Sequence, residues 1–160
     1  MQDLVEHLTN LLKTKHMKLV TAESCTGGLL ATTMTHRPGS SKVFERGFIT
    51  YSNEAKNELL GVPNDMLEKF GAVSAETAQT MAQGALKNSH ADLAVSITGI
   101  AGPDGGSEAK PVGLVYFGYA LKGGSAGSLE HRFEGDREKI QTTATITALK
   151  HLISILENSA

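Results

Sequence analysis

A serine followed by two glycines is the strongest chemical signal in this sequence. Residues 21–28 read TAESCTGG and place Ser24 where a strand pattern gives way to a helix pattern. Glycines let another molecule approach the backbone closely, because they have no Cβ. The first N–H groups of a helix have no partner within it, so they can hold an anion or a developing oxyanion. A hydroxyl beside free N–H donors is half of an acyl-transfer site.

The other half of such a site is a base, and the sequence offers Lys56. None of the six histidines lies beside a glycine-rich loop. A lysine accepts a proton only when it is neutral, and burial lowers its pKa toward that state. Lys56 falls in the first turn of a predicted helix, where the positive end of the macrodipole also disfavours the ammonium. Tyr51 ends the preceding predicted strand, and its phenol could relay a proton or orient a substrate.

Each of these residues also has a purely structural interpretation. Ser24 is of a type that caps helices, Lys56 is of a type that stays solvated, and Tyr51 fits a half-buried strand position. Cys25 could be mistaken for the nucleophile, but without an obvious His or Asn partner it is better interpreted as a small buried apolar residue. The residues alone leave these alternatives open.

Composition places this chemistry in an ordinary setting. We expect residues 1–160 to form a single globular domain, with 40% hydrophobic residues and a net charge of −2. No block of like charge points to nucleic acid or to a membrane surface. A single cysteine, a start without signal-peptide character and no long apolar run favour a cytoplasmic protein.

Helix and strand patterns alternate along the chain, which predicts a layered α/β domain. A hairpin near the C-terminus adds antiparallel strands, so we expect a three-layer α/β/α sandwich with a mixed central sheet. The predicted strands are residues 18–22, 48–51, 93–98, 112–121 and 128–133. The predicted helices are residues 4–12, 26–36, 52–60, 63–70 and 74–88, and one after residue 137.

Three polar or glycine-rich segments follow predicted strands: residues 24–28, 51–56 and 98–106. Open α/β sheets bind ligands beyond the carboxyl ends of their strands. We therefore expect these three segments to meet around one pocket.

Five sequence blocks in this order resemble the CinA C-terminal domain family, the nicotinamide-nucleotide amidases. They are TAESCTGG at 21–28, YSNEAK at 51–56, GAVS at 71–74, TGIAGP at 98–103 and GDR at 135–137. The resemblance runs from about Leu4 to Leu156. It implies hydrolysis of the carboxamide of nicotinamide mononucleotide to nicotinate mononucleotide and ammonia, in pyridine nucleotide salvage, with no metal and no cofactor.

The resemblance also assigns roles to individual residues. It implies that Ser24 is the nucleophile, through an acyl-enzyme, and that Tyr51 and Lys56 assist it. Substrate contacts are expected from the residues of the same blocks: Thr26, Gly27, Gly28, Asn53, Thr98, Gly99, Gly102 and Arg137. Among these, the backbone near Thr26–Gly28 would hold the oxyanion and Arg137 would meet the 5′-phosphate. An ion pair of Arg137 with Asp136 or Glu138 is the structural alternative.

Two other functional classes remain open at this level. One is a non-catalytic nucleotide-binding regulatory module linked to competence or DNA damage, which would have no need of Ser24, Tyr51 and Lys56 together. The other is a phosphate-binding transferase, which the absence of a Walker-type Gly-Lys-Ser/Thr disfavours. The expected partners are a small nucleotide substrate and further copies of the chain, with neither nucleic acid nor membrane.

Overall fold

A five-stranded mixed sheet forms the middle layer of the computed structural model, which describes residues 1–158. The strand order is β2-β1-β3-β4-β5. β1 is parallel to both β2 and β3, whereas β3/β4 and β4/β5 are antiparallel. The strands are β1 (Leu19–Glu23), β2 (Phe44–Ile49), β3 (Leu93–Gly99), β4 (Leu114–Leu121) and β5 (Ala126–Arg132).

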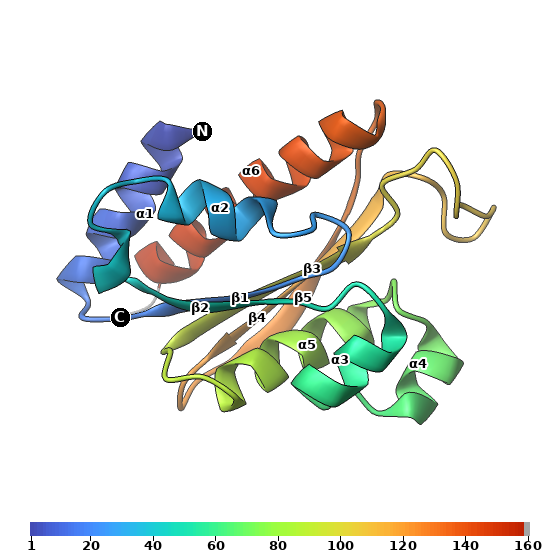
Figure 1. The fold of residues 1–160 in the computed structure, drawn as a ribbon, viewed down its shortest axis with the longest axis horizontal. Coiled ribbons are helices and arrows are strands. Elements are labelled where there is room, and N and C mark those ends of the chain that lie inside the picture. The colour runs from blue at the N-terminus through green and yellow to red at the C-terminus, as the bar shows by residue number, and fades with distance from the viewer. Residues whose placement is uncertain (159–160) are drawn as a thin grey trace.

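Helices cover both faces of the sheet, as Figure 1 shows. One face carries α1 (Gln2–Thr14), α2 (Leu29–Thr35) and α6 (Arg137–Asn158). The other carries α3 (Asn53–Leu60), α4 (Asn64–Phe70) and α5 (Ala75–Lys87), and a short 3₁₀ helix, η1 (Ser40–Lys42), precedes β2. The predicted three-layer α/β/α sandwich with a mixed sheet is therefore confirmed. None of the helices within residues 1–158 is long and apolar enough to cross a membrane.

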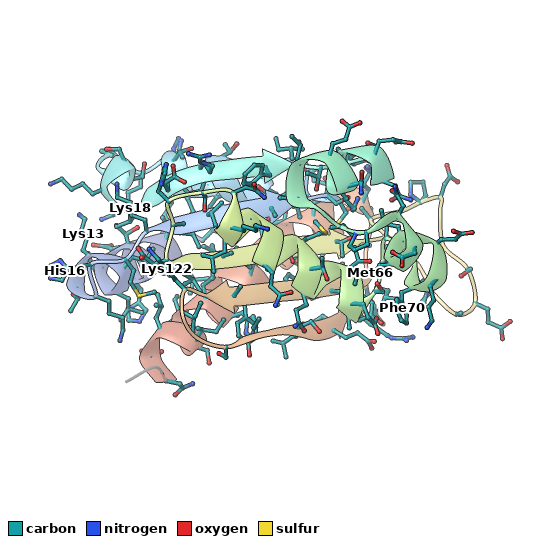
Figure 2. The ribbon with its side chains drawn as sticks, turned by 90° about the horizontal axis from the view of Figure 1, so that it is seen from below. Lys13, His16, Lys18, Met66, Phe70 and Lys122 are labelled. Carbon is teal, nitrogen blue, oxygen red and sulfur yellow. The ribbon has the colours of Figure 1, made fainter. Side chains whose placement is uncertain are left out.

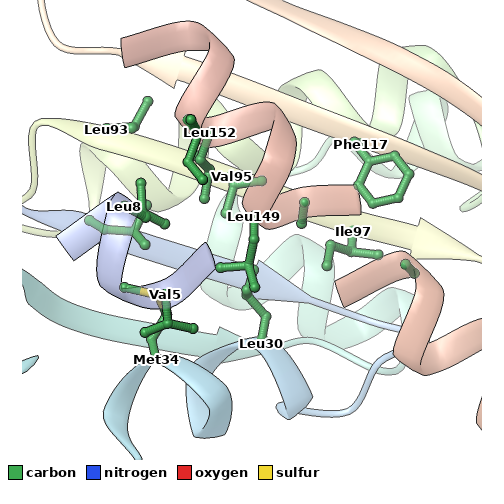
Figure 3. Packing of buried hydrophobic residues seen from close by; sticks show 14 of the residues in the cluster. Val5, Leu8, Leu30, Met34, Leu93, Val95, Ile97, Phe117, Leu149 and Leu152 are labelled. Carbon is green, nitrogen blue, oxygen red and sulfur yellow. The ribbon is translucent and has the colours of Figure 1, made fainter. Parts of the chain in front are cut away.

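The larger core lies between the sheet and the α1/α2/α6 layer (Figure 3). Its apolar side chains come from helical spacings in α1, α2 and α6 and from the buried strands β1, β3 and β4. The labelled members are Val5, Leu8, Leu30, Met34, Leu93, Val95, Ile97, Phe117, Leu149 and Leu152. Because β1, β3 and β4 are mostly buried between the two helical layers, the middle of the sheet is a rigid base for the loops at its ends.

Figure 2 shows the opposite face, with α5 lying across the sheet. Lys13, His16, Lys18 and Lys122 lie at the end of the molecule where β1 and β3 begin. Met66 and Phe70, on α4, lie at the other end, where those strands finish. The carboxyl ends of β1, β2 and β3 share that edge because the three strands are parallel.

Two predicted boundaries differ from the structure by more than two residues, and the others lie within two residues of it. The second strand was expected at residues 48–51, but β2 is Phe44–Ile49, because an edge strand tolerates the polar run Glu45-Arg46-Gly47 that hid its first half. The helix expected from Thr26 begins at Leu29, because Gly27 (φ 59°) and Gly28 (φ 103°) hold the chain in left-handed conformations before it.

A buried carboxylate closes the turn between β1 and α2. Glu23, with 1% of its surface exposed, accepts hydrogen bonds from Leu30 N at 2.9 Å, Ala31 N at 3.1 Å and the Thr26 hydroxyl at 2.6 Å. Its charge is compensated by these donors and by the positive end of α2. Thr26 is thus a donor to Glu23 rather than the helix cap, and the turn that carries Ser24 is fixed.

We expect Glu23→Gln to lower the free energy of unfolding by about 1–2 kcal/mol, because an amide loses the charge-assisted bonds at this helix start. Urea denaturation at neutral pH measures the change. Glu54→Gln is the matched control, since Glu54 is an exposed acid in the first turn of α3, and it should change stability by less than about 0.5 kcal/mol. Equal effects of the two substitutions would contradict the role given to Glu23.

Gly84 in α5 should not tolerate alanine. Glycine-to-alanine changes inside helices usually stabilise by up to about 1 kcal/mol. Here an added Cβ would lie 1.9 Å from the carbonyl oxygen of Leu60 in α3, so Gly84→Ala should destabilise by about 1–3 kcal/mol. Thermal or urea unfolding tests this, with the neighbouring exposed position Gln83→Ala as control; a stabilised Gly84→Ala variant would show that α3 can move away freely.

Candidate active site

A small cavity of about 240 Å³ opens at the edge of the sheet where β1, β2 and β3 end. The three predicted segments do meet there, and the start of α6 joins them. The cavity is lined by Ser24, Cys25, Tyr51, Asn53, Lys56, Ala72, Val73, Thr98, Gly99, Ile100, Ala101, Gly102, Asp104, Gly105 and Arg137. Its volume is below that of most drug-sized ligand pockets.

Main-chain hydrogen bonds between strand ends set the floor of this cavity. Ser24 N donates to Ile97 O at 2.9 Å, which continues the β1/β3 pairing by one residue. Thr50 N donates to Glu23 O at 2.8 Å, which does the same between β2 and β1. Ser24, which follows β1, and Thr50, which follows β2, are therefore both held in register with the neighbouring strand.

Lys56 and Ser24 are in direct contact in the cavity. Lys56 Nζ lies 3.0 Å from Ser24 Oγ, 2.9 Å from the carbonyl oxygen of Thr50 and 3.4 Å from that of Tyr51. The Ser52 hydroxyl caps α3 by accepting from Ala55 N, which fixes the turn on which Lys56 stands. The geometry pairs a hydroxyl with an amine that has two carbonyl acceptors for its remaining hydrogens.

Burial lowers the pKa of Lys56, because the residue has only 1% of its surface exposed and its charged form loses hydration. No carboxylate within residues 1–158 forms an ion pair with it. A negative charge on Cys25 would oppose this shift, but burial raises the pKa of the Cys25 thiol to about 12. Cys25 is therefore a neutral thiol, and the environment favours the neutral amine at Lys56.

Tyr51 and Arg137 form the outer wall of the cavity. Tyr51 is 61% exposed, and its phenol oxygen accepts from Arg137 Nη2 at 2.9 Å. Arg137 Nη1 donates to the Gly102 carbonyl at 2.7 Å. Across the described residues, the Tyr51 hydroxyl makes no hydrogen bond with Ser24 or Lys56, and Arg137 makes no ion pair with Asp136 or Glu138.

The remaining predicted substrate contacts fall into two groups. Asn53, Thr98, Gly99 and Gly102 line the cavity, although the Thr98 hydroxyl already donates to the Ala72 carbonyl at 2.8 Å. Thr26, Gly27 and Gly28 instead line a separate hollow beside α6.

Several residues at the site were missed by sequence reasoning. The carbonyl of Thr50 is invisible to any pattern of side chains, and Gln141 comes from the middle of an amphipathic helix. Gln141 Nε2 donates to the Cys25 carbonyl at 2.9 Å and so orients the peptide that follows the serine. Asp104 lines the cavity from the glycine-rich loop after β3, where its position in that loop was the available signal.

Residues 1–158 contain no cluster of three or more His, Cys, Asp or Glu side chains suited to a metal ion. The cavity offers a hydroxyl, an amine, an amide, a carboxylate and a guanidinium instead. This set is suited to acyl transfer with a serine and a lysine.

Known proteins resemble this chain over nearly its full length. A relative from Escherichia coli K12, "Nicotinamide-nucleotide amidohydrolase PncC", is 49% identical over 152 residues, which are 95% of this chain and 92% of the relative. A "Putative competence-damage inducible protein" from Caldicellulosiruptor bescii is 56% identical over 151 residues. The match is 94% of this chain but only 36% of that relative, so the chain spans little more than a third of its length.

Solved structures agree. The competence/damage inducible protein CihA from Agrobacterium tumefaciens superposes with a TM-score of 0.94 at 44% identity, over 98% of this chain and 94% of that one. The competence damage-inducible protein A from Klebsiella pneumoniae gives 0.95 at 33% identity, over 99% and 98%. The family model for the CinA C-terminal domain matches residues 1–156, and the chain belongs to this family.

Proposed function

We propose that this chain hydrolyses the carboxamide of nicotinamide mononucleotide to nicotinate mononucleotide and ammonia. The observation that carries the proposal is the 3.0 Å contact between Lys56 Nζ and Ser24 Oγ at the floor of a cavity without a carboxylate partner for the lysine. Membership of the CinA family and the amidohydrolase name of relatives at about half identity support the substrate.

The first step is attack of Ser24 Oγ on the carboxamide carbon. Neutral Lys56 takes the hydroxyl proton as the Oγ–C bond forms and the carbonyl oxygen becomes an oxyanion. The resulting ammonium donates to Thr50 and Tyr51, whose carbonyls already lie within reach. The Lys56–Ser24 contact makes a proton relay through the Tyr51 phenol unnecessary.

The second step expels ammonia. The tetrahedral intermediate collapses, the C–N bond breaks, and Lys56 returns its proton to the leaving nitrogen. Water then attacks the acyl-enzyme while Lys56 accepts one of its protons, and Ser24 Oγ leaves as the hydroxyl. Atoms balance as one amide and one water giving one acid and one ammonia.

The oxyanion donors follow from which amides are already engaged. Gly27 N donates to Ser24 O, and the N–H groups of Leu30 and Ala31 donate to Glu23, so these are committed. Gln141 holds the Cys25 carbonyl, and in a trans peptide the Thr26 N–H then points the other way. We assign the oxyanion to the amide of Cys25, which lines the cavity, and to that of the next residue, Thr26, although Thr26 is itself among the residues that line the separate hollow. Each donor in such a hole contributes roughly 3–4 kcal/mol.

Substrate binding is assigned to the outer wall. Arg137 can meet the 5′-phosphate with a charge-assisted pair, since its guanidinium lines the cavity and is held in place by Tyr51 and Gly102. Asn53 and the amides near Gly99 and Gly102 complete the polar contacts. Thr98 serves to hold Ala72 in the cavity wall, and Tyr51 to position Arg137.

A regulatory nucleotide-binding module is the competing function, because some relatives carry competence-damage names. A module that only binds has no use for a buried amine bonded to a serine hydroxyl. Ammonia release from nicotinamide mononucleotide by the purified protein separates the two, and binding without any release would favour the module. Pyridine nucleotide salvage in the cytoplasm is the proposed setting of the reaction.

Ser24→Ala should lower kcat for ammonia release by about 10³-fold or more, because the nucleophile is lost while its surroundings remain. Cys25→Ala is the matched control, since its neutral, buried thiol has no role in the proposed chemistry, and it should keep most activity. Circular dichroism checks that both fold. Loss of activity in the cysteine variant with retention in the serine variant would overturn the assignment.

Lys56→Arg should be nearly as inactive as Lys56→Ala, because arginine keeps a charge and does not deprotonate near neutral pH. In the parent enzyme kcat should rise with pH as Lys56 loses its proton, and burial places that rise below the ordinary lysine range. Rates at saturating substrate across pH measure both effects. An arginine variant close to the parent rate would show that the lysine acts only through its charge.

A further inference from the structure

Two basic side chains and one carboxylate line the cavity: Lys56, Arg137 and Asp104. Burial favours the neutral form of Lys56. Arg137 is engaged with Tyr51 and Gly102. Asp104 is different, because it is an exposed residue whose carboxylate makes no hydrogen bond and no ion pair within the described part of the chain.

Hydrogen bonds and close packing hold the loop that carries Asp104. Arg137 holds the Gly102 carbonyl at one side, and Ser107 N donates to Lys110 O at 2.8 Å at the other. The loop also packs tightly on Val112, since a Cβ on Gly102 would lie 2.5 Å from Val112 Cγ1 and one on Gly106 would lie 2.8 Å from Val112 N. The backbone on both sides of Asp104 is therefore held in place where Asp104 lines the cavity.

We infer that Asp104 is the specificity-determining residue for the positive charge of the substrate's ring, an N-ribosylated pyridinium carboxamide. The inference rests on the proposed function. A pyridinium ring placed with its carboxamide at Ser24 brings a permanent cation into a small cavity. Arg137 repels that cation and neutral Lys56 does not compensate it, so the only carboxylate lining the cavity supplies the counter-charge.

The charges that line the cavity then complement a ligand that carries one negative and one positive group. Arg137 attracts the phosphate and Asp104 attracts the ring, so each end of the ligand meets the opposite charge. A carboxylate can also bind the hydroxyls of a ribose, which would make Asp104 a sugar contact instead. The two roles differ in one respect: only the first depends on the charge of the ring.

Reduced nicotinamide mononucleotide is the probe, because its dihydropyridine ring is neutral while its ribose and phosphate are unchanged. Dissociation constants for both nucleotides are measured by calorimetry at low ionic strength in a Ser24→Ala background, with and without Asp104→Asn. We expect Asp104→Asn to weaken binding of the oxidised nucleotide by about fivefold and that of the reduced nucleotide by less than about twofold, as for one charge pair near the surface.

Two controls accompany the measurement. Asp104→Glu keeps the charge and should preserve the preference for the oxidised nucleotide. Glu108→Gln removes a charge from the same loop at a position that does not line the cavity, and it should leave both constants unchanged.

Equal weakening of the two nucleotides by Asp104→Asn would identify a ribose contact, and no weakening would identify a bystander; either result overturns the inference while ammonia release by the parent enzyme still supports the amidase. If the parent neither binds nor hydrolyses the oxidised nucleotide, the proposed function itself fails and this inference falls with it.

Discussion

A buried lysine amine that forms no ion pair with any carboxylate in residues 1–158 is the constraint on which the rest of this site depends. An ammonium in that position would have lost its hydration with no carboxylate to replace it, which is costly inside a protein. A neutral amine needs only two acceptors and one donor. The carbonyls of Thr50 and Tyr51 and the hydroxyl of Ser24 supply this set. In the proposed mechanism, the burial that favours the neutral amine also leaves the lone pair that activates the serine.

The directions of the five strands bring the segments that form the site to one edge of the sheet. Three parallel strands bring the ends of β1, β2 and β3 to one edge. Two antiparallel steps, through β4 and β5, then return the chain to that edge, so α6 begins beside the cavity and Arg137 reaches Tyr51 and Gly102. The hairpin is thus as important for the site as the parallel strands, although none of its residues lines the cavity.

The layers could be predicted from the alternation of helix and strand patterns together with the hairpin. The apolar spacing of α1 and α6 requires one face of each helix to pack on the sheet, and the apolar run of β3 indicates a strand buried on both faces. The meeting of three loops also followed from topology. The start of β2 did not, since Glu45 and Arg46 belong to an edge strand whose polar side chains resemble a loop. The start of α2 was misplaced because the two glycines that precede it adopt left-handed conformations, which a sequence pattern does not reveal.

The features of the site that the sequence did not predict have a common physical origin. Ser24 and Lys56 could be proposed together because both side-chain types carry recognisable chemistry. Their acceptors could not, because they are backbone atoms of Thr50 and Tyr51, and every residue has a carbonyl. Glu23 shows a related limit. Nothing in the sequence marks this acid as buried, yet it accepts hydrogen bonds from the helix N-terminal amides that a sequence argument assigns to the ligand. With those amides committed, the proposed oxyanion donors are the amides of Cys25 and Thr26. Gln141 holds the peptide between these two residues, although it lies 116 residues from Cys25 in the chain. The catalytic geometry is therefore a property of the tertiary fold around a recognisable pair of side chains.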